Sequence, residues 1–185
     1  LGHYFAVLNN TNKQQYFEQQ AAQRRAAINQ YLFSADMGFF VDFNYQSQQQ
    51  STVLSLAATV PLFVNCASEE QAVLVKNKLM SDFLKPGGLV TTLNETSQQW
   101  DSPNGWAPLQ WFAVHGFHQY GFVADANTIM SNWLQMIENS FKTDHCLLEK
   151  YNVYEPENRA GGGEYKVQQG FGWTNGVTSR FYHLI

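Results

Sequence analysis

The sequence predicts an all-α domain, and three observations support this prediction. Apolar and small residues recur three and four positions apart in several long segments, which is the period of an amphipathic helix. Serine and threonine residues precede such segments, where their side chains can cap a helix N-terminus. Alternating patterns do not extend beyond about four residues, so strands are expected to be short.

The first predicted helix covers residues 11–33 and begins at Thr11. It carries aromatic and alanine residues between Gln, Arg and Lys, so it is expected to be amphipathic. Gly38 then interrupts the period, and the polar residues 46–51 predict a surface loop. A second helix is expected over residues 51–66.

A third helix is predicted after a capping box formed by Ser68 and Gln71. The serine oxygen can accept from the Gln71 amide while the Gln71 side chain reaches back to the serine amide. Apolar residues four apart continue this helix from Val75 to Phe83, and the Lys-Pro-Gly-Gly of residues 85–88 ends it.

Further helices are expected over residues 106–120 and 125–141, and a last one begins near Thr174. The intervening residues 89–105 form a loop rich in Thr, Ser, Asn and Gln. Helices joined alternately by short turns and long loops, with the unusual residues gathered in the long loops, predict an α/α toroid. A closed double ring needs about twice the roughly six helices counted, so this chain would supply about half of one.

Composition excludes several classes of function. The chain has 185 residues and 44% apolar content, which suits one globular domain with its own core. Its net charge is −4 and its 11 Lys and Arg are scattered, so nucleic acid is not an expected partner. The longest apolar stretch, residues 52–67, is too short for a bilayer and contains Pro61 and Asn65, so no membrane contact is expected.

No metal or other cofactor is predicted. His115 and His118 have a spacing that can chelate a metal, but no carboxylate or cysteine completes a ligand set near them. Cys66 and Cys146 fit no metal spacing. A disulfide and two buried thiols both remain open for this pair, so the cysteines leave the cellular compartment undetermined.

The stretch QQWDSPNGWAPLQW, residues 98–111, is the first candidate binding segment. A flat aromatic face can cover the C–H side of a pyranose while polar groups bind its hydroxyls, so Trp100, Asp101 and Trp106 are candidate sugar contacts. A purely structural interpretation stays open. In that case Trp106 and Pro108 start a helix, and Asp101 caps a neighbouring turn.

The stretch GGGEYKVQQGFGWTNGV, residues 161–177, is the second. Its glycines let the backbone approach a ligand or hinge over it, which predicts a lid carrying Glu164 and Tyr165. A flexible linker is the alternative. The other candidate binding residues of this stretch are Phe171, Trp173 and Asn175.

Glu149 directly follows HCLL, a segment that is expected to be buried. A carboxylate beside an apolar wall can act as a general acid or base. The alternative is a solvated Glu149 paired with Lys150 at a helix end.

Taken together, the two stretches, with EKYNV between them, resemble the signatures of the trehalase family of glycoside hydrolases. The segments RRAAINQYLF, GFFVDFNY and KPGGLVTT are similar to the same family pattern, so the resemblance covers nearly the whole chain. It implies an α/α toroid of the six-hairpin glycosidase type. It also implies hydrolysis of α,α-trehalose to two glucose molecules with inversion, without metal or cofactor.

The resemblance also implies roles for individual residues. Glu149, the glutamate of EKY, matches the general base that deprotonates the attacking water. Inverting enzymes hold this base about 6.5 to 9.5 Å from the general acid. Glu164 resembles a second glutamate that contacts the sugar from the lid. The remaining candidates would line or support the pocket: Trp100, Asp101, Trp106, Tyr165, Phe171, Trp173 and Asn175.

Two family features find no match in this sequence. The general acid belongs to a Ser-Gly-Trp-Asp-type stretch, and Asp42, Asp101 and Asp125 do not stand in such a context. The sugar-gripping arginines of the first half of the family pattern are also unmatched. In the lid, Ala160 precedes three glycines where the family often has four or more.

The resemblance therefore implies that residues 1–185 are the C-terminal half of a single trehalase catalytic domain. Trehalose or glucose would be its ligand and the missing N-terminal half its partner, and the isolated chain is expected to be inactive. Two alternatives stay open: a non-catalytic trehalase-like module that binds sugar or assembles, and a toroidal enzyme acting on another α-glucoside.

Overall fold

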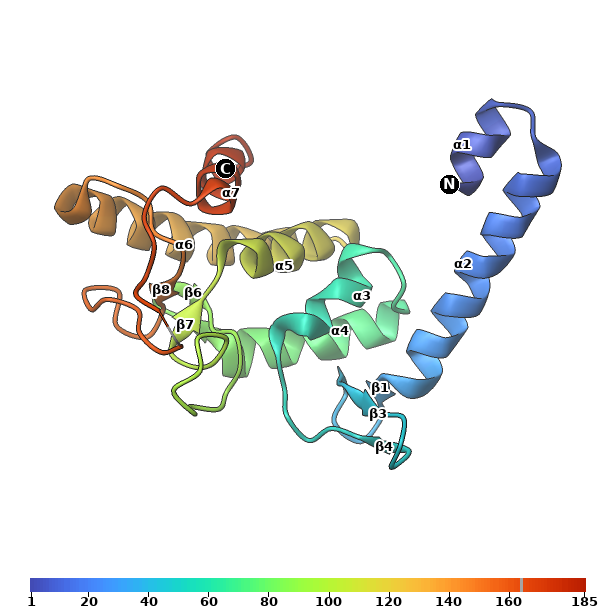
Figure 1. The fold of residues 1–185 in the computed structure, drawn as a ribbon, viewed down its shortest axis with the longest axis horizontal. Helices are drawn as coiled ribbons and strands as arrows, with labels where there is room; N and C mark the ends of the chain where they lie inside the picture. Colours follow the sequence, from blue (N-terminus) through green and yellow to red (C-terminus); the bar gives the residue numbers. More distant parts are fainter. Residues whose placement is uncertain (164) are drawn as a thin grey trace.

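The structure is a computed structural model that describes residues 1–163 and 165–185. It is mostly helical (Figure 1). Its α-helices are α1 (Gly2–Val7), α2 (Thr11–Tyr31), α3 (Val60–Phe63), α4 (Glu69–Lys78), α5 (Ala107–Gln119), α6 (Val123–Asp144) and α7 (Gly172–Tyr182). A 3-10 turn, Leu56–Thr59, precedes α3, and a π-helical turn, Leu79–Phe83, follows α4.

The strands are two residues long, as the absence of longer alternating patterns predicted. They pair as four antiparallel ladders: β1 (Phe33–Ser34) with β2 (Phe39–Phe40), β3 (Phe43–Asn44) with β4 (Gln49–Gln50), β5 (Leu84–Lys85) with β6 (Gly88–Leu89), and β7 (Asn104–Gly105) with β8 (Tyr151–Asn152).

Helix α5 is central to the body of the molecule, where it packs against α3, α6 and α7. A three-residue connection, 120–122, joins α5 to α6 as a helical hairpin. Phe117 of α5 and Ile129 and Trp133 of α6 are fully buried in the core. The helices predicted over residues 106–120 and 125–141 are thus confirmed, because their apolar faces cover each other.

The capping box predicted before α4 is also confirmed. The Gln71 amide donates to Ser68 Oγ at 3.2 Å, and the Ser68 amide donates to Gln71 Oε1 at 2.8 Å. Val75 and Leu79 are fully buried below it. This end of the helix is therefore defined by local sequence alone.

The helix predicted over residues 51–66 is wrong in its first part. Ser55 is extended and bridges to Thr92, and helical structure begins only at the 3-10 turn, followed by α3. Pro61 lacks an amide hydrogen and is accepted only in the first turn of a helix, so it marks the start of α3 rather than its interior. The last helix, predicted near Thr174, is confirmed as α7.

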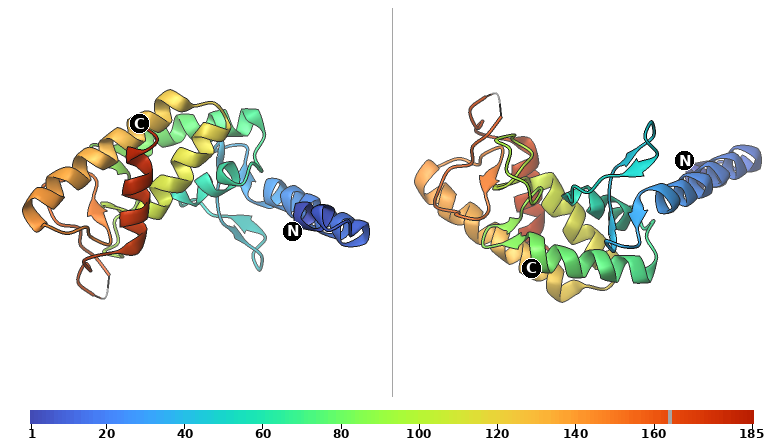
Figure 2. Two further views of the ribbon diagram at one scale, coloured as in Figure 1. Left: turned by 90° about the horizontal axis from the view of Figure 1, so that it is seen from above. Right: turned by 90° about the horizontal axis from the view of Figure 1, so that it is seen from below.

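Helices α1 and α2 form an arm that projects from the body in all three views (Figures 1 and 2). The helix predicted over residues 11–33 is present, but none of the residues of α2 is buried. Its main partner is α1, which the sequence did not predict, and the rings of Phe5 and Phe17 stack with centroids 5.4 Å apart. Helix α2 is therefore mostly exposed, although Ile28 near its C-terminal end packs partly against the core.

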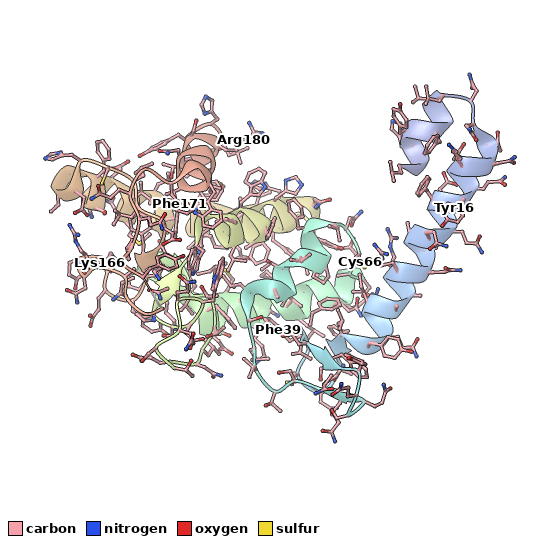
Figure 3. All side chains as sticks on the ribbon, in the orientation of Figure 1. Tyr16, Phe39, Cys66, Lys166, Phe171 and Arg180 are labelled. Atoms are coloured by element: carbon pink, nitrogen blue, oxygen red, sulfur yellow. The ribbon has the colours of Figure 1, made fainter. Side chains whose placement is uncertain are left out.

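The exposure of individual side chains differs between the arm and the body. Figure 3 shows Tyr16 on the arm and Phe39 in the body. Tyr16 is 56% exposed and Phe39 is fully buried. Among the described residues, no helix combines the length and apolar character needed to cross a membrane.

Candidate active site

Three segments that are distant in sequence meet around Glu149. Strands β7 and β8 pair Asn104 with Asn152 and Gly105 with Tyr151, which joins the first signature stretch to the segment after α6. On the other side, the Glu149 amide donates to the carbonyl oxygen of Gln168 at 2.9 Å, next to a bridge from Leu148 to Gln169. Glu149 therefore lies between the two signature stretches.

Glu149 is held inside the protein and not in solvent, since the residue is only 3% exposed. The Tyr165 hydroxyl donates to Glu149 Oε1 at 2.8 Å. Glu149 Oε2 is buried and has no hydrogen-bond partner among the described residues. A buried carboxylate oxygen left in this way is available to accept a proton or a hydrogen bond from a molecule that enters the site.

A cluster of tryptophan rings contacts the backbone of Glu149 through Trp173. The rings of Trp100 and Trp106 stack with centroids 3.9 Å apart, and Trp173 meets Trp106 edge to face at 5.8 Å. The Trp173 indole nitrogen also donates to the backbone oxygen of Glu149 at 3.3 Å. Trp106 is 1% exposed and Trp100 is 43% exposed, so Trp106 supports the stack while Trp100 presents a face to solvent.

The glycine-rich segment lies against the first signature stretch. The Gly163 amide donates to the Ser97 carbonyl at 3.0 Å, and the Asn104 side chain donates to the Gly161 carbonyl at 2.8 Å. Gly162 has a φ of +77°, and a Cβ there would lie 3.0 Å from the carbonyl oxygens of residues 97 and 98. Glycine is required here by both backbone conformation and space.

Lys150 is fully buried beside the same segment. Its ammonium donates to the Gly162 carbonyl at 3.1 Å. Burial lowers the pKa of Lys150, and the charge of Glu149 offsets part of that change. The alternative of a solvated pair between Glu149 and Lys150 is therefore wrong, because both side chains are buried.

Asp101 uses its carboxylate within its own loop. Oδ2 accepts from the amide of Thr96 at 2.9 Å and also from the Thr96 hydroxyl, and Oδ1 accepts from the Thr92 hydroxyl at 3.3 Å. Burial acts to raise the pKa of Asp101, but these hydrogen bonds outweigh it and hold the pKa below its ordinary value.

Residues 2–185 match the model of a protein family described as Trehalase. The chain belongs to the trehalase family. Among solved structures it is similar to neutral trehalase Nth1 from Saccharomyces cerevisiae, with 27% identity and a TM-score of 0.78, over 91% of this chain and 30% of that protein. It is also similar to a GH63 mannosylglycerate hydrolase from Thermus thermophilus in complex with glucose, with 18% identity and a TM-score of 0.76, over 98% of this chain and 41% of that one.

These matches support the fold predicted from the sequence. The mostly helical arrangement is that of the α/α-toroid glycosidases. The chain spans less than half the length of the solved relatives it matches, so it contains part of such a ring.

In this trehalase-family chain, the structure brings several predicted site residues together. Tyr165, Trp106 and Trp173 lie around Glu149 or its neighbours, Trp100 stacks on Trp106, and Phe171 packs on Trp173 with ring centroids 4.7 Å apart. Figure 3 shows Phe171 just before the first turn of α7. Their roles stay predictions. Glu164 lies outside the described residues.

Asn175 has different surroundings. Its side chain is exposed and donates to the Phe171 carbonyl at 3.0 Å. It lines a cavity of about 450 Å³ with residues of α6 and α7, including Ile137 and Tyr182, and Glu149 is not among the lining residues. Its predicted contact with a sugar remains without support from geometry.

Two residues that shape the site were not predicted from the sequence. Lys150 was considered only as a surface partner of Glu149, and Asn104, which anchors the glycine-rich segment, was not considered at all. The one signal for Asn104 is its position before Gly105 in a stretch of unusual composition. In the described part of the chain, no group of three or more His, Cys, Asp and Glu side chains could hold a metal ion.

Proposed function

We propose that this chain is the C-terminal half of a single trehalase catalytic domain and that Glu149 is its general base. The complete enzyme hydrolyses α,α-trehalose to two glucose molecules with inversion. One observation carries this proposal. Glu149 is buried between the two signature stretches, with one carboxylate oxygen bound by Tyr165 and the other without a partner among the described residues.

This geometry gives each carboxylate oxygen a separate task. Tyr165 holds Oε1 and fixes the orientation of the carboxylate, so Oε2 accepts a proton from water. The water oxygen then bonds to the anomeric carbon as the glycosidic bond breaks, and the departing oxygen takes a proton from the general acid. That acid belongs to the missing half and stands about 6.5 to 9.5 Å from Glu149.

Other residues bind the substrate in this proposal. Trp100 offers its exposed face to the C–H side of a glucose ring, and Trp106 and Trp173 keep that face in position. Glu164 contacts the sugar from the lid. Asp101 acts through the loop that it holds rather than by touching the sugar.

Apolar surface that this chain leaves exposed supports the proposal that the chain forms half of an α/α toroid. The arm of α1 and α2 buries none of the side chains of α2. Between α5 and α7, a mostly apolar cavity of about 420 Å³ is lined by Trp111, Phe112 and Val177, among others. The N-terminal half is the proposed partner that covers these surfaces.

The test uses the complete enzyme and the Glu149→Gln substitution. Loss of a general base should lower kcat by about 10²- to 10⁴-fold in a glucose-release assay with trehalose. Glu138→Gln is the matched control. Glu138 also accepts a hydrogen bond from a tyrosine, since the Tyr182 hydroxyl donates to Glu138 Oε1 at 2.6 Å, but this pair does not contact Glu149. Nearly unchanged turnover of Glu149→Gln would refute the assignment of the base.

Two further assays test the reaction and the half-domain assignment. Inversion predicts one β-glucose and one α-glucose from each trehalose, because only the attacked carbon changes configuration, and NMR of the first products distinguishes this from two α anomers. The 185-residue chain alone should release no glucose and should gain activity with the N-terminal half. Faster hydrolysis of maltose than of trehalose would contradict the proposed substrate.

A further inference from the structure

Lys150 is a buried cation whose neighbours belong to two segments that are distant from each other in the sequence. Its side chain is fully buried directly after Glu149. Removing an ammonium from water is costly unless other groups replace its hydration. The groups that do so indicate what the residue is for.

These two segments supply the surroundings of the Lys150 ammonium. The first signature stretch contributes Gln99, whose Oε1 lies 3.5 Å from Nζ, and the ring of Trp106 at 5.4 Å. The glycine-rich segment contributes the Gly162 carbonyl at 3.1 Å and the ring of Tyr165 at 5.7 Å. Carbonyl oxygens and aromatic faces both attract a cation, so the ammonium links the two stretches.

The hydrogen bond from Lys150 to the Gly162 carbonyl can affect the position of Glu149 through Tyr165. Gly162 is three residues from Tyr165, whose hydroxyl donates to Glu149 Oε1. One hydrogen bond ties Gly161 to Asn104 of the first signature stretch, and another ties Gly163 to Ser97, which directly precedes that stretch. The bond from Lys150 ties the glycine-rich segment to the segment that carries Glu149 itself.

We propose that Lys150 is a positioning residue for Glu149. Its ammonium holds Gly162 and thereby keeps Tyr165 within hydrogen-bonding distance of the Glu149 carboxylate. This inference rests on the proposed function for its catalytic consequence, while the structural link can be tested without any catalysis.

The first experiment measures amide hydrogen exchange in the 185-residue chain. Lys150→Met keeps an unbranched apolar stem and removes the donor, and exchange of the Gly163 amide should become about tenfold faster. Lys85→Met is the matched control. The Lys85 ammonium lies 4.7 Å from the ring centroid of Tyr154, so that substitution also removes a cation from an aromatic ring, but away from Glu149. Unchanged exchange at Gly163 in Lys150→Met would overturn the proposal, whatever the outcome for Glu149→Gln.

The second experiment measures kinetics in the complete enzyme. Misplacing a catalytic group by about 1 Å can cost about 100-fold in rate, and we expect Lys150→Met to lower kcat by about 10- to 100-fold. If Lys150 acts through Tyr165, the double variant with Tyr165→Phe should be no slower than the slower single variant. Fully multiplicative losses would overturn the proposed route through Tyr165.

A reverse experiment covers the case in which Lys150→Met does not fold. In Gly162→Ala the new Cβ would press on the carbonyl oxygens of residues 97 and 98, which displaces the segment while Lys150 is retained. Reductive methylation of the Lys150 amine should then be about tenfold faster than in the unsubstituted chain, because its cover has moved. Equal methylation rates would refute the link between Lys150 and Gly162.

Discussion

The hydroxyl of Tyr165 donates a hydrogen bond to Oε1 of Glu149 across 2.8 Å, and it joins the glycine-rich segment to a buried carboxylate. A second pair has the same chemistry on the surface, where the Tyr182 hydroxyl donates to Glu138 Oε1 at 2.6 Å. The two pairs can therefore serve as controls for each other.

The first prediction concerns the titration of Tyr165. Its hydrogen bond to the Glu149 carboxylate, followed by desolvation, raises the pKa of Tyr165, because the phenol that donates is favoured over the phenolate. Glu149→Gln should lower the pKa of Tyr165 toward the ordinary value of about 10. The pKa of Tyr182, raised to about 12 chiefly by its bond to Glu138, should stay unchanged.

Carbon NMR of tyrosine labelled at Cζ measures both values in one sample. Glu138→Gln should give the opposite result, with the pKa of Tyr182 lowered and that of Tyr165 unaffected. An unchanged Tyr165 pKa in Glu149→Gln would mean that the hydrogen bond does not form in solution.

The second prediction separates the two stacked tryptophans. Trp106→Ala removes a fully buried ring and should lower the free energy of unfolding by about 3 to 5 kcal/mol. Trp100→Ala removes a half-exposed ring and should cost only about 0.5 to 1.5 kcal/mol, the value of an aromatic pair. Urea unfolding followed by circular dichroism measures both, and equal losses would contradict the division into a supporting and a presenting ring.

The third prediction concerns pH and Asp101. Its folded-state pKa is lowered, so its carboxylate stabilises the fold at pH values above its unfolded pKa of about 3.9, and this contribution is lost as the pH falls through the folded pKa. Asp101→Asn should therefore unfold at lower urea concentration than the unsubstituted chain at about pH 7. The difference should disappear in strong acid, and a difference independent of pH would refute the assignment.

The fourth prediction concerns the arm. Removing residues 1–26 deletes α1 and most of α2 but keeps Ile28 and Leu32, which pack against the core. Because α2 buries no side chain, the body should lose less than about 1 kcal/mol, which corresponds to less than about 4 °C in Tm. A larger loss in a thermal melt would show that the arm folds back onto the body.

Local sequence was sufficient wherever an element is determined by its own residues. The capping box of Ser68 and Gln71 and the apolar faces of α5 and α6 were predicted because capping and periodicity are encoded within a few turns. Helix α2 was predicted from the period of its apolar and small residues, but its exposure was not predicted. Burial depends on the elements that pack against a helix, and α2 packs mainly on α1 and, through Ile28, on the core.

The candidate site could be predicted only in part, for a related reason. Glu149 and Tyr165 stood out through family resemblance and composition, but their hydrogen bond depends on how separate segments meet. The burial of Lys150 and the role of Asn104 depend on the same packing of separate segments against each other. The helix expected over residues 51–66 was misjudged because it placed Pro61 in the interior of a helix, whereas Pro61 lies in the first turn of α3.

The bridge from Leu148 to Gln169 also has a consequence for synthesis of the protein. A chain emerging from the ribosome exposes its N-terminal part first, so the helices up to α6 can pack while the glycine-rich segment is still untranslated. Glu149 therefore lacks its tyrosine donor until Tyr165 has been translated. A ribosome stalled before the codon for Tyr165 would thus carry a largely folded body in which this carboxylate is still without that donor.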